Sequence, residues 1–219
     1  PCPQFPPARS EVEQLQSYSA PLEGRRGMLR LDFNENSIGP SPKVVEAIRG
    51  IPAEHYAIYP EYDGLREAFS QSLGGLPCEQ IGLFNGVDAA LHAICQAYGN
   101  PGVVMITTSP TFGYYQPCAG MQGMVVNAIP FVGVDYRFPL QDMQRALAQL
   151  NPRLLLLCNP NNPTGTRLEA EAICQLAAAA PSTLVVVDEL YEAFTGDSVL
   201  PQADFSATPN LLVLRSLSK

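Results

Sequence analysis

Short apolar runs alternate with longer stretches of helical periodicity along most of this chain. A run of four or five apolar residues predicts a buried strand, because a helix needs more residues to cross a core. Apolar residues that recur every three or four positions predict the buried face of a helix. Strands are predicted at 81–84, 103–107, 125–129, 154–158, 184–187 and 211–214, and helices at 64–73, 87–98, 111–120, 140–150 and 169–180.

A further helix is predicted to begin after Ser41. Ser41 is a good helix cap, Pro42 suits the first turn, and Gly50 ends the apolar periodicity. Residues 1–40 contain scattered prolines and glycines and no sustained pattern. We therefore predict an N-terminal arm over residues 1–40 and one α/β domain from residue 41 onward.

The alternation of strand and helix is typical of a parallel sheet with helices on its faces. The predicted strands are short, continuous and mostly apolar, as expected for a sheet that is covered on both sides. The expected fold class is therefore α/β, with three layers and a mostly parallel sheet. Because ligands of such sheets bind beyond the carboxyl ends of the strands, the polar residues after each apolar run are the candidate site residues.

Composition narrows the possible functions. The chain of 219 residues is 46% hydrophobic and 16% charged, which is typical of a globular protein. A formal net charge of −8 without a basic stripe argues against nucleic acid and anionic membranes as partners. The six cysteines form no CxxC pair and favour free thiols in a reducing compartment. With no signal-peptide pattern and no apolar run of about 18 residues, we expect a soluble cytoplasmic protein.

The polar residues after the predicted strands suit the aldehyde cofactor pyridoxal 5′-phosphate (PLP). Lys219 lies in a hydroxyl-rich turn after a buried strand, where its amine could bind the aldehyde as a Schiff base. Asp188 ends another apolar run, where a carboxylate could keep the pyridine nitrogen protonated. The structural alternatives are a turn cap for Asp188 and a surface lysine for Lys219.

Two other residues could donate to the phenolic oxygen of the PLP ring. Asn162 belongs to Asn-Asn-Pro-Thr-Gly, in which Pro163 and Gly165 predict a tight turn that orients the amide. Tyr191 follows Asp188 by three positions. The alternatives are a purely structural turn for Asn162 and a core aromatic for Tyr191.

The phosphate of PLP needs hydrogen-bond donors. Val87 and Asp88 open a predicted helix, where free backbone N–H groups and the helix dipole favour an anion. Ser216 and Ser218 would add hydroxyl donors, and Phe112 could stack on the ring. Helix capping by Asp88 and core packing of Phe112 remain as alternatives. The two histidines are not accompanied by clustered cysteines or carboxylates, so we predict neither a metal site nor a Ser-His-Asp triad.

Taken in order, these motifs resemble those of the fold type I PLP-dependent enzymes, and among them the histidinol-phosphate aminotransferase family. The resemblance covers nearly the whole chain. It rests on the segments LDFNEN (31–36), YPEY (59–62), GVD (86–88), PTFG (110–113), NPNNPTG (159–165), DELY (188–191) and SLSK (216–219).

The resemblance implies that residues 41–219 are the PLP-binding large domain up to its Schiff-base lysine, and that the small C-terminal domain of the family lies outside this chain. Lys219 would also carry protons between substrate and cofactor, and Asp188 and Tyr191 would complete the catalytic set. The implied cofactor-binding residues are Lys219, Asp188, Asn162, Tyr191, Phe112, Val87, Asp88, Ser216, Ser218 and Tyr59.

Other family properties concern the substrate and the partner subunit. Tyr59 is similar to a tyrosine that reaches the phosphate of the second subunit, which implies a homodimer. Tyr18 and Asn34 resemble residues of the arm that lie near the substrate. The partners implied are a small-molecule amino donor and a 2-oxo acid acceptor.

The activity expected from the resemblance is transfer of an amino group between L-histidinol phosphate and 2-oxoglutarate, in histidine biosynthesis. A threonine-phosphate decarboxylase or another class I/II amino-acid aminotransferase is the nearest alternative, because these enzymes share the cofactor residues. A non-catalytic PLP-binding module and an inactive fragment are alternatives of another class. Expressed alone, residues 1–219 are expected to lack transaminase activity, since the family's anion-binding arginines lie beyond Lys219.

Overall fold

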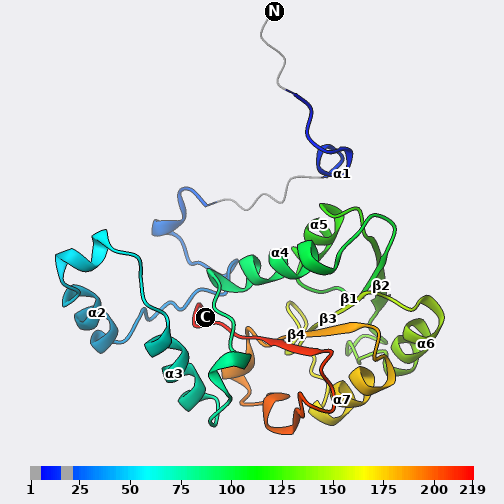
Figure 1. Cartoon of the computed structure of the whole chain (residues 1–219). Coiled ribbons are helices and arrows are strands. Elements are labelled where there is room, and N and C mark those ends of the chain that lie inside the picture. Colours follow the sequence, from blue (N-terminus) through cyan, green and yellow to red (C-terminus); the bar gives the residue numbers. More distant parts are fainter. Residues whose placement is uncertain (1–5, 16–21) are drawn as a thin grey trace, which may run out of the picture. The chain divides into compact units, whose positions relative to one another are not determined.

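The computed structural model describes residues 6–15 and 22–219 of the chain (Figure 1). These residues fall into two compact units. The first contains residues 84–218 together with 6–15, and the second contains residues 22–83 together with Lys219. This division does not follow the predicted boundary at residue 40, and the assignment of residues 41–219 to one large domain stays a prediction.

A parallel sheet forms the centre of the first unit. Its five strands have the order β2-β1-β3-β4-β5, and every neighbouring pair is parallel. Buried residues make up the whole of β3 and all of β4 after its first residue, which explains why these segments are apolar up to the carboxylate that ends β4. The strands are β1 (Val104–Ser109), β2 (Val125–Pro130), β3 (Leu154–Cys158), β4 (Leu184–Asp188) and β5 (Leu211–Leu214).

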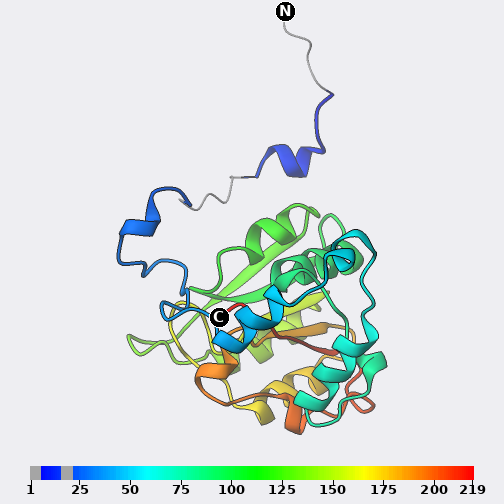
Figure 2. The same cartoon turned by 90° about the vertical axis from the view of Figure 1, so that its left-hand side faces the viewer.

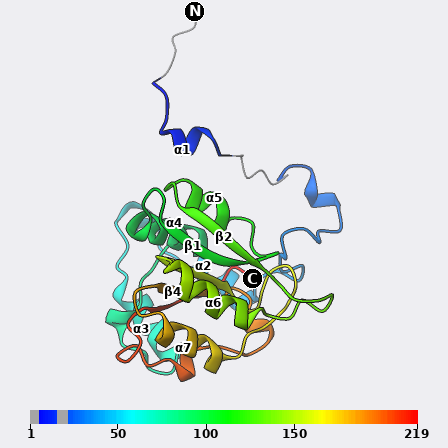
Figure 3. The same cartoon turned by 90° about the vertical axis from the view of Figure 1, so that its right-hand side faces the viewer.

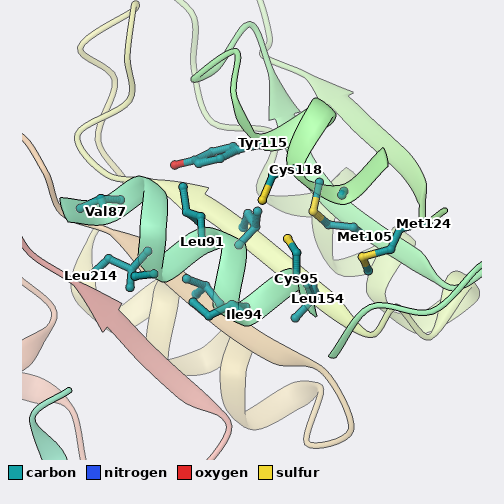
Figure 4. Close-up of a cluster of buried hydrophobic side chains, with 14 of the residues drawn as sticks. Val87, Leu91, Ile94, Cys95, Met105, Tyr115, Cys118, Met124, Leu154 and Leu214 are labelled. Atoms are coloured by element: carbon teal, nitrogen blue, oxygen red, sulfur yellow. The ribbon is translucent and has the colours of Figure 1, made fainter. Parts of the chain in front are cut away.

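Helices cover both faces of this sheet and produce two core clusters. Figures 1 and 3 show α4 (Gly86–Tyr98) and α5 (Tyr115–Gly120) on one face, and α6 (Leu140–Leu150) and α7 (Ala170–Ala179) on the other. Alternate residues of β3 point to opposite faces, so Leu154 packs under α4 and α5 (Figure 4) while Leu155 packs under α6 and α7. The three-layer α/β architecture expected from the sequence is confirmed.

Most predicted elements are present with similar bounds. The predictions for α6, β3 and β5 match to the residue, and α3 (Asp63–Ser72), α4, α7, β1, β2 and β4 lie within two residues of their predicted limits. Helix α2 (Pro42–Arg49) begins as expected, because the Ser41 hydroxyl accepts a hydrogen bond from the Lys43 N–H at 3.3 Å. Local capping and periodicity therefore determine these boundaries.

Two predictions were wrong. Residues 81–84 form no strand; a short apolar run becomes a strand only where a neighbour completes its hydrogen bonds, and Phe84 is largely exposed instead. The helix expected from residue 111 begins only at Tyr115. Before it, Thr111 donates its hydroxyl proton to the Asn161 side chain at 2.7 Å, so a contact distant in sequence replaces the first helical turn.

The second unit consists of short helices (Figure 2). None of its residues from 22 to 83 is buried. It contains α2, α3 and the 3₁₀ helices η1 (Arg25–Gly27), η2 (Ala53–Ala57) and η3 (Cys78–Gln80), whereas α1 (Ser10–Glu13), η4 (Glu192–Phe194) and η5 (Leu200–Gln202) belong to the first unit. Across the described ranges, every helix is too short or too polar to cross a membrane.

Candidate functional site

The carboxyl ends of three neighbouring strands bring the predicted segments to one edge of the sheet. Strand β1 ends at Ser109, β3 at Cys158 and β4 at Asp188. Cys158 and Asp188 are register partners in their parallel pair. The Pro-Thr-Phe-Gly segment, the Asn-Asn-Pro-Thr-Gly segment and the turn after Asp188 therefore all leave the sheet at this edge.

Asp188 is a buried carboxylate with a donor on each oxygen. The Tyr115 hydroxyl donates to Oδ2 at 2.8 Å, and the Leu190 N–H donates to Oδ1 at 3.1 Å. Burial raises the pKa of Asp188 above its usual value, whereas these two hydrogen bonds lower it and the nearby Asp88 carboxylate raises it. The bond from Leu190 is the turn cap considered as an alternative for Asp188, but the bond from Tyr115 ties the carboxylate to a different element of the fold.

Tyr115 was missed by the sequence reasoning. Its side chain is only 1% exposed, and its ring meets the Phe112 ring edge-on, with centroids 5.5 Å apart at 87°. Phe112 is half-buried against the core cluster that contains Tyr115. Burial, followed by the negative charge of Asp188, raises the pKa of the Tyr115 phenol well above its ordinary value. The raised pKa favours the neutral phenol, which is the form that donates to Asp188.

The Asn-Asn-Pro-Thr-Gly segment is held in place by Asn161. This residue is 4% exposed, and its Nδ2 donates to the Pro110 carbonyl at 3.0 Å and to Thr164 Oγ1 at 2.8 Å. Its Oδ1 accepts the hydroxyl proton of Thr111. Asn161 thus links the loop after β3 to the loop after β1, while the next residue, Asn162, is half-buried.

Asn159 and Cys158 anchor the start of the same loop. Asn159 Nδ2 donates to the Leu168 carbonyl at 3.0 Å, and its Oδ1 accepts from the Leu168 N–H at 2.8 Å. The Asn162 N–H lies 3.4 Å from Cys158 Sγ. Burial raises the pKa of Cys158 to about 12, so this sulfur stays a thiol and acts in packing.

Next to Asp188, a second buried carboxylate binds the arginine that directly follows the last strand. Glu189 is 1% exposed and accepts hydrogen bonds from the Val199 N–H at 2.7 Å, from the Ser198 hydroxyl at 2.7 Å and from Arg215 Nη1 at 3.0 Å. Arg215 also forms an ion pair with Glu192. The arginine therefore connects the end of β5 to the turn after β4 on both sides of Tyr191. Arg215 was not predicted, because its two carboxylate partners lie more than 20 positions away.

The other predicted residues of the first unit lie at element ends. Helix α4 begins at Gly86, whose φ of +81° favours glycine, and the N-cap residue supplies no side-chain hydrogen bond. At this helix start Val87 is buried and Asp88 is exposed. After β5, the Ser216 hydroxyl donates to Ser218 Oγ at 2.9 Å. The half-buried ring of Tyr191 lies beside that of a nearby phenylalanine.

The remaining predicted residues belong to the second unit or lie outside the description. Asn34 is exposed with a φ of 52°, and Tyr59 is 98% exposed. Lys219 is half-buried, and its Nζ donates to the Phe33 carbonyl at 2.6 Å. Tyr18 lies outside the described residues.

Comparisons with known proteins agree on one family. The profile of the family aminotransferase class I and II matches residues 26–219. A histidinol-phosphate aminotransferase of Symbiobacterium thermophilum is 35% identical over 222 residues, which cover 96% of this chain and 60% of that protein. Its counterpart in Neisseria meningitidis serogroup B is 34% identical over 220 residues, covering 96% and 58%.

A solved structure extends this agreement to three dimensions. The histidinol-phosphate aminotransferase of Sinorhizobium meliloti, in complex with pyridoxal-5′-phosphate, superposes with a TM-score of 0.85 at 26% identity, covering 99% of this chain and 60% of that one. The chain spans 58–60% of the length of these relatives. Since the family profile matches nearly the whole chain, the chain belongs to the aminotransferase class I and II family.

Proposed function

We propose that the native protein is a PLP-dependent aminotransferase of the histidinol-phosphate type. It would transfer an amino group between L-histidinol phosphate and 2-oxoglutarate, giving imidazole acetol phosphate and L-glutamate. The names of relatives 34–35% identical over 96% of the chain support this substrate. The cytoplasmic location expected from the sequence stays a prediction.

The observation that carries the proposal is the Asp188 carboxylate at the carboxyl edge of the sheet. Each of its oxygens receives one hydrogen bond, and a carboxylate oxygen can accept a second. A buried carboxylate with free acceptor capacity fits the protonated nitrogen of the PLP pyridine ring. When bound, PLP supplies an aldehyde that takes up the amino group and a ring that withdraws electrons.

The other cofactor roles are proposed from the resemblance of the sequence motifs to the family. Phe112 would stack on the ring, since its side chain lies against the tyrosine that binds Asp188. Asn162 and Tyr191 would donate to the phenolic oxygen. Lys219 would hold the aldehyde carbon covalently and move protons at the substrate α-carbon.

The start of α4 would receive the phosphate. The N-cap residue of this 13-residue helix makes no side-chain hydrogen bond to the first turn, so the first N–H groups of the helix suit an anion. The residues proposed for the phosphate are Val87 and Asp88, through their backbone, and Ser216 and Ser218, through their hydroxyls. Asn34 and Tyr18 are proposed to lie near the substrate.

A homodimer is part of the proposal, with Tyr59 contributed to the site of the partner subunit. Large apolar side chains of the second unit are exposed, with Leu29 at 85%, Leu31 at 80% and Ile38 at 95%. Exposed apolar surface of this kind is typical of protein interfaces. Mixing Tyr59→Ala with Lys219→Ala subunits should restore roughly a quarter of wild-type activity, because half of the randomly paired dimers have one intact site. Two inactive parents that stay inactive after subunit exchange would refute the shared site.

The central test uses the native protein and reduction with borohydride. Wild type should bind PLP, and reduction should attach it to Lys219; Lys43, the other lysine of the chain, is the internal control. Steady-state rates with L-histidinol phosphate, phosphothreonine and common amino acids then identify the substrate. A label on Lys43, or normal turnover in Lys219→Ala, would contradict the assignment. Decarboxylation of phosphothreonine would favour the alternative function, and PLP binding without turnover would favour a binding module.

A further inference from the structure

Tyr115 contacts two residues that the proposed function places against different parts of the cofactor ring. Its hydroxyl donates to Asp188, the proposed partner of the ring nitrogen, and its ring packs against Phe112, proposed to stack on the ring face. We propose that Tyr115 is a positioning residue that fixes Asp188 and Phe112 relative to each other for PLP. This inference rests on the proposed function and adds a residue that the sequence motifs did not indicate.

Tyr115 can do this because its own position is fixed. It is the first residue of α5, and its ring is 1% exposed within the cluster shown in Figure 4. The Tyr115 N–H also donates to the Phe112 carbonyl at 3.3 Å. Backbone and ring contacts therefore both tie Tyr115 to Phe112, and a tightly packed core allows little movement of either.

The hydrogen bond to Asp188 completes the arrangement. The Leu190 N–H alone would hold one oxygen and leave the carboxylate free to rotate. The Tyr115 hydroxyl holds the second oxygen at 2.8 Å, so the plane of the carboxylate is set before any ligand binds. Because Tyr115 also favours the charged form of Asp188, its loss should affect both the orientation and the protonation of the proposed partner of the ring nitrogen.

A purely structural role for Tyr115 would predict a different effect of its replacement on the bound cofactor. A buried tyrosine that only fills the core would contribute to stability and leave the cofactor's properties unchanged. PLP affinity, and the pH at which the absorbance of bound PLP changes, report on the contact between Asp188 and the ring. These two quantities distinguish positioning from packing.

The test compares Tyr115→Phe with Tyr98→Phe in the native protein. Both variants lose one hydroxyl, but Tyr98 is 44% exposed at the end of α4. Tyr115→Phe should weaken PLP binding by about 10-fold or more, as expected for a lost hydrogen bond to a charged group, and should shift the pH transition of the bound cofactor. Tyr98→Phe should match wild type in both. In an Asp188→Asn background, Tyr115→Phe should have little further effect on PLP affinity.

The outcomes separate this inference from the proposed function. If wild type binds PLP and Tyr115→Phe has the same affinity and pH transition, the inference is overturned, even if thermal stability falls. If wild type binds no PLP, the proposed function fails and the inference with it. Should Tyr115→Phe not fold, 3-fluorotyrosine at position 115 keeps the shape and strengthens the donor. An unchanged pH transition in that protein, relative to wild type, would also overturn the inference.

Discussion

Replacing Arg215 with methionine should destabilise the native protein by about 2 kcal/mol. Arg215 Nη1 lies 3.0 Å from Oε2 of Glu189, and its Nη2 pairs with Glu192. The side chain of Glu189 is completely inaccessible, while that of Arg215 is 30% exposed. Methionine keeps most of the apolar stem and removes the charge, so the variant leaves a buried carboxylate without its cation.

The magnitude follows from the burial of the two partners. Removing one partner of a fully buried pair costs about 3–5 kcal/mol, whereas an exposed pair contributes about 0–1 kcal/mol. Solvent reaches Arg215 and screens it in part, and Glu189 keeps its hydrogen bonds from Val199 and Ser198. An intermediate value of about 2 kcal/mol is therefore expected.

The loss should depend on pH. Burial raises the pKa of Glu189, and Arg215 is among the groups that lower it. Without Arg215 the folded-state pKa rises further above that of the unfolded chain. The folded variant then retains a proton that the unfolded chain releases, so its stability falls as pH rises from the ordinary glutamate value through the raised one. The deficit relative to wild type should be largest near neutral pH and shrink in acid, where Glu189 is neutral.

Urea unfolding of wild type and variants measures this effect. It is carried out at about pH 7 and about pH 4.5, which lie on either side of the expected change. Arg145→Met is the matched control, because Arg145 pairs with Asp142 at 3.0 Å on the surface of α6, with side chains 62% and 52% exposed. The control should lose no more than about 0.5 kcal/mol. Adding Glu189→Gln to Arg215→Met should recover part of the loss. Equal losses for Arg215→Met and Arg145→Met, or a deficit independent of pH, would refute the reasoning.

Three further predictions concern the site and the core. Asp188→Asn should still bind some PLP but lose at least ~100-fold in turnover; kcat within a few-fold of wild type would reduce Asp188 to a structural residue. Asn161→Ala should weaken PLP binding and lower the free energy of unfolding by about 1–3 kcal/mol, because it frees the loop that carries Asn162; an unchanged PLP titration would show that this loop is held by other contacts. Leu155→Ala, fully buried in β3, should cost about 2–5 kcal/mol in urea unfolding, whereas Val134→Ala, 99% exposed, should stay within about 0.5 kcal/mol; similar losses would contradict the assignment of the core.

Local sequence determined most of the secondary structure of this protein. Ser41 starts α2 through a hydrogen bond two residues away, and the bounds of α6, β3 and β5 follow from periodicity and apolar runs. Such signals depend on neighbours within one or two turns, so they can be recognised without the tertiary structure. The positions of Asp188, Asn162 and Phe112 after apolar runs likewise sufficed to predict one edge of a parallel sheet.

Tertiary structure decided which residues support that edge. Tyr115 and Asp188 are 73 positions apart, Thr111 and Asn161 are 50 apart, and Arg215 reaches Glu189 across 26. Nothing near Tyr115 in the sequence indicates that its hydroxyl meets a carboxylate. The same long-range contacts removed the first turn of the predicted helix at Thr111. A hydrogen bond between distant residues depends on strand order and helix packing, which periodicity along the chain does not encode, and for this reason only the folded structure revealed these contacts.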